Sequence, residues 1–187
     1  MRRLWSTEAE TFRDHLKRLD PEARRLRFTG AISDIYLDRY AQEALAADGV
    51  TYGWFRDGAL RAAAELRPLT PRIQDGIVVR DGEAAFSVER DWQGTGIGTA
   101  LMRRVLQAAR NRGLRRIIVT CLPENVRMQK VARKHDARIV FEDGDVVGLL
   151  TQPSPSGWSL WREAVQEGHG LVDRMFEGQR KAVGKAA

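Results

Sequence analysis

The sequence lacks several features that would define a class of protein on their own. Cysteine occurs once, as Cys121, so the chain can form neither an internal disulfide nor a cysteine-rich zinc site. No apolar run approaches the 18 residues of a membrane-spanning helix, and the first 25 residues lack the apolar stretch of a signal peptide. We therefore expect a soluble protein that does not enter a membrane, with a cytoplasmic location.

Length and composition are those of a globular protein. The 187 residues, 43% apolar and 30% charged, suffice for one domain with an appendage. The net charge of +6 suggests an anionic partner. This excess is local, because residues 90–134 hold 11 basic and 2 acidic residues, whereas the remainder holds 20 basic and 23 acidic ones.

Apolar periodicity and turn signals predict an α+β chain. Roughly the first 45 residues are predicted to be helical, with a helix over 7–19, a second after Asp20-Pro21 and a third after Ser33-Asp34. Antiparallel hairpins are then predicted around three Asp-Gly pairs, at 57–58, 81–82 and 143–144.

Between the last two predicted hairpins, the pattern changes to alternating helix and strand. A helix is expected over 97–112, with Gly113 at its C-terminal cap, followed by a strand over 116–120 and a helix over 125–135. Residues 1–150 are thus expected to form one domain.

The C-terminal part of the sequence has a different character. Residues 151–157 form a Pro/Ser-rich linker, and residues 158–187 are expected to form an amphipathic helical tail. Its apolar side chains are Trp158, Trp161, Val165, Val172, Met175 and Phe176. Such a stripe would leave an exposed apolar patch if unpaired, so the tail is expected to dock on the domain or to join two copies in a homodimer.

The segment most informative about chemistry runs from a predicted strand into a predicted helix. It reads Gln93-Gly-Thr-Gly96-Ile-Gly98. Backbone N–H groups at a helix N-terminus lack intrahelical partners, and glycines let an anion approach them closely, so the segment predicts a phosphate cradle. Its spacing does not fit G-x-G-x-x-G, and the Gly-Lys-Ser/Thr of a nucleotide P-loop is absent.

Gln-x-x-Gly-x-Gly between a strand and a helix resembles motif A of the GNAT superfamily of acyl-CoA-dependent N-acyltransferases. The order of elements from about residue 5 to 150 resembles the GNAT order as well. Two further segments, Leu122-Pro-Glu-Asn125 with the helix after it and Arg25–Asp34, resemble the bacterial branch that contains protein-lysine acetyltransferases. The resemblance implies a mixed, mostly antiparallel sheet, splayed at a central parallel strand pair and flanked by helices.

The resemblance also implies how acetyl-CoA would bind, as a co-substrate and with no metal. It would lie between two splayed strands, 83–89 and 116–121, with the Val88 main chain and Asn125 contacting the pantetheine arm. Backbone amides of the motif would hold the pyrophosphate, and these belong to Gln93, Gly94, Thr95, Gly96, Ile97 and Gly98. Arg103 and Arg133 are candidates for further phosphate contacts.

Transfer of an acetyl group to a primary amine, by direct attack in a ternary complex, needs a base because the amine is mostly protonated at pH 7. Glu83 matches a glutamate at this place in the lysine-acetyltransferase branch, although a hairpin-edge glutamate can also be merely solvated. Glu89 is the alternative base, and is more typical of a solvated charge at the end of a strand. Residues 83, 85, 87 and 89 are expected to share one face of the strand.

The proton donor for the leaving thiolate is not assigned by the sequence. Many family members carry a tyrosine seven residues after the asparagine, where this chain has Ala132. Ser87, Cys121 or water are the replacements considered, and Cys121 equally suits a small core residue. The three histidines, His15, His135 and His169, show no metal-ligand spacing and are expected at the surface.

Two other functions compete with the enzyme. The missing tyrosine leaves room for a non-catalytic acyl-CoA-binding regulatory module. Nucleic-acid binding is not expected, because the basic cluster 103–116 contains no aromatic residue. The residues expected to line the acceptor pocket do not indicate which small-molecule or protein amine is the acceptor. They are Arg27, Phe28, Asp34, Tyr36 and Phe141.

Overall fold

The fold is built on a seven-stranded mixed sheet. The computed structural model describes residues 1–46 and 48–168. Neighbouring strands are antiparallel except for one central parallel pair, β6 and β7. In spatial order the strands are β1 (Arg2–Leu4), β2 (Val50–Arg56), β3 (Ala59–Pro68), β6 (Asp81–Val88), β7 (Arg116–Cys121), β9 (Asp145–Thr151) and β8 (Arg138–Glu142). The expected α+β class and mixed sheet are thus confirmed.

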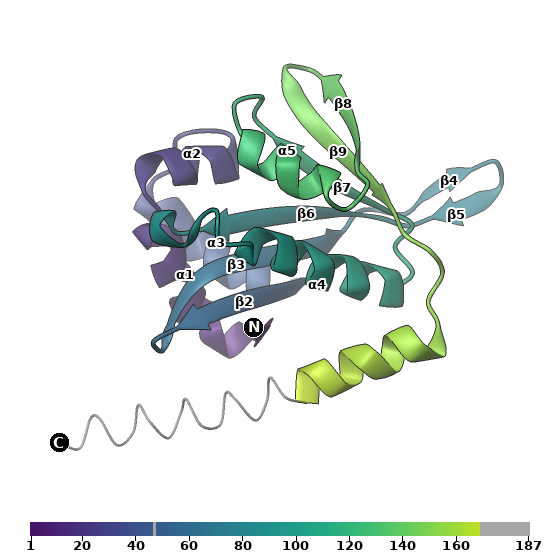
Figure 1. Ribbon diagram of the computed structural model, residues 1–187, viewed down its shortest axis with the longest axis horizontal. Helices are drawn as coiled ribbons and strands as arrows, with labels where there is room; N and C mark the ends of the chain where they lie inside the picture. Colours follow the sequence, from purple (N-terminus) through teal and green to yellow (C-terminus); the bar gives the residue numbers. More distant parts are fainter. Residues whose placement is uncertain (47, 169–187) are drawn as a thin grey trace.

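Helices cover both faces of this sheet (Figure 1). One face carries α1 (Ala9–Arg18), α2 (Pro21–Phe28) and α3 (Asp34–Ala46), which are the three helices expected in the first 46 residues. The other face carries α4 (Ile97–Asn111) and α5 (Val126–Arg133). Two single-turn 3-10 helices, η1 (Ser6–Glu8) and η2 (Arg90–Trp92), precede α1 and α4.

Alternation along β3 divides the core into two apolar clusters. Ala62, Ala64 and Leu66 face the cluster built around α4, whereas Ala63 belongs to the cluster under α1 and α3. Because cross-strand partners share a face, the register of β3 with β6 places Ala84, Phe86 and Val88 on the α4 side. Glu83, Ala85 and Ser87 consequently lie on the side of α1 to α3.

The hairpin predicted at Asp81-Gly82 is wrong. Asp81 begins β6, is buried and pairs with Arg72 and Arg116, while Gly82 lies in the extended strand. The turn is at Asp75-Gly76 instead, between β4 (Arg72–Gln74) and β5 (Ile77–Val79), where both turn residues have positive φ. This hairpin projects from the body (Figure 1). The turns at 57–58 and 143–144 are confirmed.

Residues 157–168, here called the tail helix, lie along α4 (Figure 1). Polar contacts hold it there: the buried Glu163 carboxylate accepts hydrogen bonds from Tyr52, Asn111 and Arg112. Trp158 and Trp161 stack on each other with ring centroids 4.8 Å apart and remain 68% and 56% exposed. Docking on the domain therefore uses the opposite side of the helix from the tryptophans. Val172, Met175, Phe176 and His169 lie outside the described residues.

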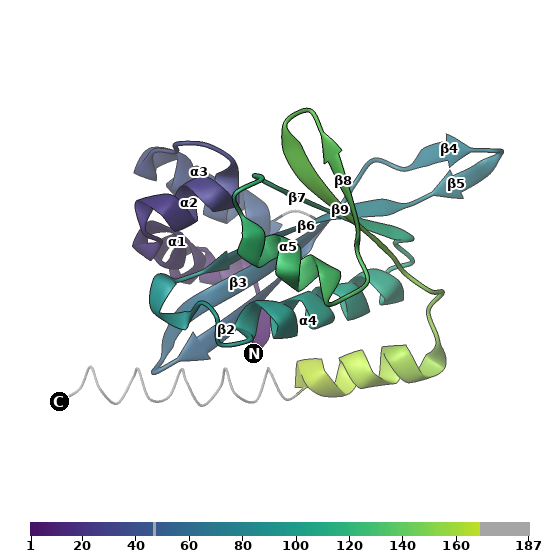
Figure 2. The same cartoon turned by 45° about the horizontal axis from the view of Figure 1, so that its top comes forward.

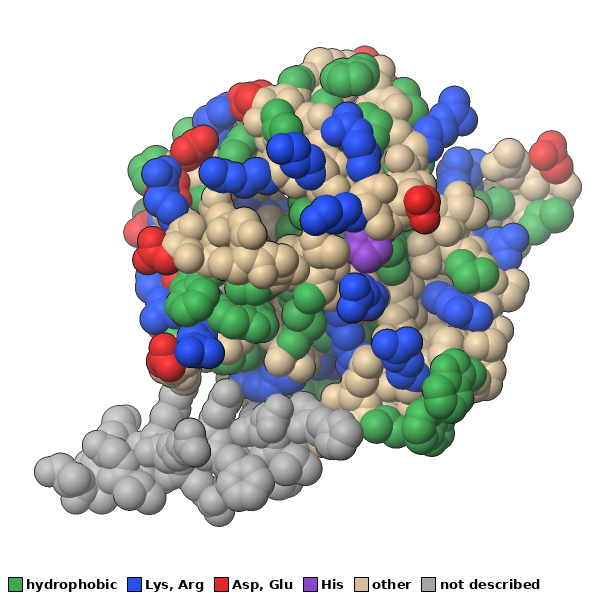
Figure 3. All heavy atoms as spheres, in the orientation of Figure 1, with side chains coloured by type: hydrophobic (Ala, Val, Ile, Leu, Met, Phe, Trp, Pro, Cys, Tyr) green, Lys and Arg blue, Asp and Glu red, His purple; other side chains and the backbone are tan. Residues whose placement is uncertain are grey.

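Several arginines of the basic segment 90–134 contact the C-terminal segment. Arg110 binds Ser154 and Ser156 and Arg104 binds Gln166, both on the C-terminal segment, while Arg103 lines a cavity against the tail helix. Lys and Arg side chains still dominate the face over α4 and α5 (Figure 3). Within residues 1–46 and 48–168, no helix combines the length and apolarity needed to span a membrane.

Candidate active site

The central parallel strands part soon after they meet. β6 and β7 pair at only three positions, the last being Glu83 with Ile118. Beyond it, β6 continues with β3 to Val88 and β7 continues with β9 to Cys121. Figures 1 and 2 show the two strands diverging toward α2 and α5. The facing edges, 84–88 and 119–121, therefore offer main-chain groups to a ligand rather than to each other.

A glycine-rich turn follows at the open end of β6. Gly94 and Gly96 have φ values of 75° and 87°, a left-handed conformation that favours glycine, and α4 begins directly after Gly96. No side chain caps this helix. The first amides of α4 are thus available, at the positive end of the helix dipole, to bind an anion.

Two arginines missed by the sequence analysis stand beside this turn. Arg90 and Arg127 line a cavity of about 200 Å³ together with Glu22, Gln93 and Gly94. Arg90 pairs with Asp20 and Glu22, and Arg127 donates to Gln93 Oε1 at 2.5 Å. Both arginines belong to the basic span 90–134, but only the fold distinguishes them from the arginines that bind the tail. Arg133, in contrast, contacts Gln129 on its own helix.

The Gln93 side chain bridges the mouth of the gap between the strands. Its Nε2 donates to the Val88 carbonyl at 3.0 Å, while its Oε1 accepts from Arg127. The Val88 main chain is expected to pair with the pantetheine arm, and its carbonyl is here bonded to the side-chain amide of Gln93. A ligand amide pairing there would have to displace it.

Asn125 serves as the N-cap of α5, with Oδ1 accepting from the Met128 amide at 3.1 Å. The cap fixes the start of α5 at the far side of the gap between the strands. A contact between Asn125 and the cofactor stays a prediction.

Glu83 lies where β6 and β7 part. It is exposed, faces the side of α1 to α3, and has Arg67 of β3 as its cross-strand neighbour. An exposed carboxylate at this point can reach both a molecule in the gap and solvent. Its catalytic role stays a prediction.

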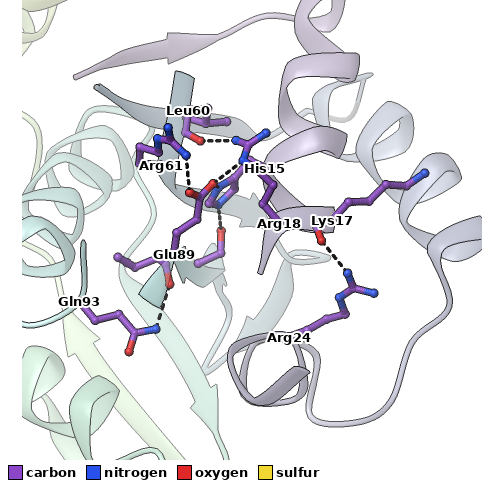
Figure 4. A network of polar contacts seen from close by, with 10 residues as sticks. His15, Lys17, Arg18, Arg24, Leu60, Arg61, Glu89 and Gln93 are labelled. Carbon is purple, nitrogen blue, oxygen red and sulfur yellow. Dashed lines mark hydrogen bonds and ion pairs between the residues drawn. The ribbon is translucent and has the colours of Figure 1, made fainter. Parts of the chain in front are cut away.

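The other carboxylate considered as a base, Glu89, is buried in a network with α1 (Figure 4). It accepts from His15 Nδ1 at 3.1 Å and from Arg18 and Arg61 at 2.9 Å each. Burial alone raises the pKa of this carboxyl, but the hydrogen bonds from His15 and Arg61 outweigh it and lower the pKa to about 2. Glu89 is therefore neither a solvated charge nor an effective base.

His15 corrects a second expectation, because it is fully buried rather than at the surface. Its Nε2 lies 2.8 Å from Ser87 Oγ. Burial lowers the pKa of this imidazole, so it is neutral at pH 7. His135 is half-buried and contacts the Thr99 carbonyl.

Both side chains considered as the proton donor, Cys121 and Ser87, are buried. Cys121 is buried, and burial raises the pKa of its thiol to about 11. Ser87 is buried against His15. Ala132 is buried where α5 approaches β9, and a Cβ added to Gly148 would lie 3.5 Å from the Ala132 Cβ. No described side chain replaces the missing tyrosine at that position.

The residues expected to line the acceptor pocket come from α2, α3 and β8, and most of them contact neighbouring side chains. Phe28 packs edge-on against Tyr36, Arg27 is buried against Glu65, and Asp34 pairs with Arg24. Phe141 is 73% exposed on β8. Among the described residues, no three His, Cys, Asp or Glu side chains gather to hold a metal ion.

Known proteins resemble this chain in sequence and in structure. Acetyltransferase Pat from Mycolicibacterium smegmatis is 38% identical over 121 residues, 62% of this chain and 34% of that protein. The chain thus spans about a third of the length of this curated relative.

Among solved structures, the GNAT domain of S. lividans PAT is 25% identical, with a TM-score of 0.66 over 80% of this chain and 88% of that one. The protein yncA from Salmonella typhimurium, solved with its cofactor acetyl-CoA, shares the fold at 12% identity, with a TM-score of 0.59 over 83% of this chain and 95% of that one. The model of the acetyltransferase (GNAT) family matches residues 12–137. This match covers over two thirds of the chain, and the chain also has a central strand pair that parts beside a glycine-rich turn. The protein is therefore a member of the GNAT acetyltransferase family.

Proposed function

We propose that this protein transfers the acetyl group of acetyl-CoA to a primary amine by direct attack in a ternary complex. The observation that carries the proposal is the parting of β6 and β7 immediately beside the glycine-rich start of α4. Unpaired strand edges suit the amides of a pantetheine arm, and free helix amides suit a pyrophosphate.

The residues fit this co-substrate along the length of the gap. The amides from Gln93 to Gly98 would hold the pyrophosphate, because Gly94 and Gly96 present no side chain there. The Val88 main chain would pair with the pantetheine arm once the Gln93 side chain has moved aside. Asn125 would contact the same arm from the start of α5, and Arg90 and Arg127 would add positive charge beside the cradle.

Glu83 would serve as the base, directly or through one water, because it stands exposed where the strands part. It would take a proton from the ammonium group of the acceptor, and the neutral amine would then attack the thioester carbonyl. The carbonyl–sulfur bond breaks as the amide forms, the nitrogen gives up its second proton to water, and the thiolate of CoA leaves. Since Ser87 is bonded to His15 and Cys121 is buried, water would carry that proton to the thiolate.

The exposed position of Glu83 also favours an acceptor carried on a macromolecule. A small amine is usually enclosed by its pocket, whereas here Glu83 and the neighbouring strand face are open. A lysine side chain extending from a protein surface can reach such a site.

The test is a thiol-release assay with acetyl-CoA and a panel of free lysine, a polyamine, a lysine peptide and intact proteins. We expect release of CoA with the lysine peptide or the proteins, and acetyl-lysine detected by mass spectrometry. The alternative, a non-catalytic acyl-CoA-binding regulatory module, predicts acetyl-CoA binding without turnover of any amine. That outcome would overturn the proposed activity.

Arg127 is expected to strengthen acetyl-CoA binding. Arg127→Ala removes one charge beside the cradle and is expected to raise the acetyl-CoA dissociation constant about tenfold, with a weaker salt dependence. Isothermal titration at two salt concentrations measures both. Arg103→Ala, on the second turn of α4 and beside the tail helix, is the matched control. Equal effects of the two substitutions would contradict this assignment.

A homodimer through the tail remains part of the proposal. Trp158 and Trp161 are 68% and 56% exposed, so most of their stacked rings is available to a second copy. We expect Trp158→Glu combined with Trp161→Glu to halve the mass measured by light scattering, whereas Ile35→Glu, at an exposed position on α3, leaves it unchanged. A wild-type protein that is monomeric at high concentration would refute the dimer. The cytoplasmic location also stays a prediction.

A further inference from the structure

A buried network joins helix α1 to the end of β6 at the residues on either side of Val88. His15 contacts Ser87 Oγ at 2.8 Å through Nε2 and Glu89 Oε1 at 3.1 Å through Nδ1. The two partners are alternate residues of one extended segment, so both side chains point toward α1. One imidazole thus holds this segment at two points (Figure 4).

The charges of the network determine which atoms carry protons. Glu89 is an anion that already accepts from two arginines, Arg18 and Arg61. A proton on His15 would add a second uncompensated positive charge in a buried site, which is unfavourable. The neutral imidazole therefore donates a hydrogen bond from Nδ1–H to Glu89, and its Nε2 accepts a hydrogen bond from the Ser87 hydroxyl. This leaves Ser87 without a free proton for the CoA thiolate.

The held segment is the part of β6 that has no partner on its other side. β7 leaves after Glu83, so the edge of residues 84–88 is supported by β3 alone. Glu89 ends that edge and opens the turn of η2, with its amide bonded to the Arg61 carbonyl and its carbonyl to the Trp92 amide. The glycine cradle begins four residues later. A shift at Glu89 would therefore move the strand edge and the cradle relative to each other.

We propose that His15 is a positioning residue for acetyl-CoA, which fixes the Val88 main chain at the correct distance from the glycine cradle by bonding Ser87 and Glu89. His15 is fully buried, so it acts through these neighbours and does not touch substrate. The inference rests on the proposed function, since it assigns a role in binding the same co-substrate.

The inference predicts coupled effects on acetyl-CoA affinity. His15→Asn keeps a donor near Glu89 but is too short to reach Ser87, and Ser87→Ala removes the hydroxyl itself. Each is expected to raise the acetyl-CoA dissociation constant about tenfold, the effect of losing one buried hydrogen bond. Because both remove the same bond, the double variant should bind about as well as either single variant. The KM for the amine should change little.

The control is a substitution in α1 that destabilises the helix but removes no hydrogen bond to β6. Leu16→Ala, at the next and fully buried position, leaves a cavity in the cluster under α1 and α3. It should lower the melting temperature yet leave the acetyl-CoA dissociation constant unchanged at a temperature where all variants are folded. Ser87→Ala, a small change within a strand, keeps the test decisive if the His15 variant does not fold.

Titration calorimetry with acetyl-CoA separates the possible failures. Wild-type protein that does not bind acetyl-CoA would overturn the proposed function itself. Three outcomes would overturn the positioning role alone, provided that the wild type binds acetyl-CoA. The first is a dissociation constant that is the same in His15→Asn and Ser87→Ala as in the wild type, and the second is one that rises in them no more than in Leu16→Ala. The third outcome is that the effects of the two substitutions add up in the double variant.

Discussion

Replacing Glu83 with glutamine is expected to lower kcat for amine acetylation by about 10²–10⁴-fold, the range that a positioned proton acceptor contributes. Glutamine keeps the size of the side chain but has no basic oxygen to accept the proton. Glu83 is exposed, so neither the melting temperature nor the KM for acetyl-CoA should change appreciably. Steady-state kinetics at saturating acetyl-CoA measures the effect.

The pH dependence distinguishes a missing base from a damaged site. With Glu83→Gln, residual activity should rise with pH more steeply than that of the wild type, because only the fraction of the amine that is already neutral in solution can attack. Glu22→Gln, which removes a carboxylate beside the glycine-rich turn, is a control that should keep the wild-type dependence of activity on pH. Full activity of Glu83→Gln across the pH range would show that another group accepts the proton.

Glu89→Gln should behave differently from Glu83→Gln, because its carboxylate neutralises Arg18 and Arg61 inside the protein. Glutamine removes the negative charge and one of the two acceptor oxygens that Arg18, Arg61 and His15 share, so protein stability and acetyl-CoA affinity should both fall. The two glutamates of one strand segment are thus separable by experiment, although the sequence presents them as alternatives for one role.

Local signals predicted the glycine-rich turn and the helix that follows it. The positive φ values of Gly94 and Gly96 and the start of α4 at Ile97 follow from glycine chemistry and from an apolar stripe, both of which are confined to a few residues. The GNAT order of elements could likewise be predicted, because each helix and most hairpins carry their own periodicity and turn residues.

The error at Asp81-Gly82 shows where local signals stop. Asp75-Gly76 and Asp81-Gly82 lie six residues apart, and both have the composition of a two-residue turn. Only the first has a solvated turn conformation. Asp81 is instead neutralised by Arg72 and Arg116, the second of which lies 35 residues away. A Cβ on Gly82 would meet Leu114 at 2.9 Å, so that glycine is needed for close packing rather than for a turn.

Tertiary pairing also explains the error at His15. Its partners, Ser87 and Glu89, are more than 70 residues away, and no periodic pattern links them. The same is true of the basic segment 90–134, because the sequence shows its positive charge but not which groups the individual arginines contact. Arg90 and Arg127 meet at the cradle, while Arg104 and Arg110 bind the C-terminal segment.

The largest expected loss of stability comes from Glu65, a buried carboxylate on β3. It accepts hydrogen bonds from Arg27, from the Tyr40 hydroxyl at 2.8 Å and from Arg67 at 2.9 Å. Burial alone would raise the pKa of this carboxyl, but Arg27 and Arg67 outweigh it and hold the pKa below its usual value. Glu65→Ala should lower the free energy of unfolding by about 3–5 kcal/mol, because it leaves the buried Arg27 guanidinium unpaired.

Chemical denaturation at pH 7 measures the loss in the free energy of unfolding. We expect the unpaired charge of Arg27 to be its cause. Glu65→Leu combined with Arg27→Met removes both charges, so this double variant should be more stable than Glu65→Ala alone. Since the folded pKa of Glu65 is depressed, its stabilisation is complete above the unfolded value near 4.5 and is lost as the pH falls through the folded pKa. The difference between wild type and Glu65→Gln should therefore shrink on acidification. A difference that stayed constant below pH 4.5, or a double variant less stable than Glu65→Ala, would show that packing rather than charge pairing holds α2 and α3 to the sheet.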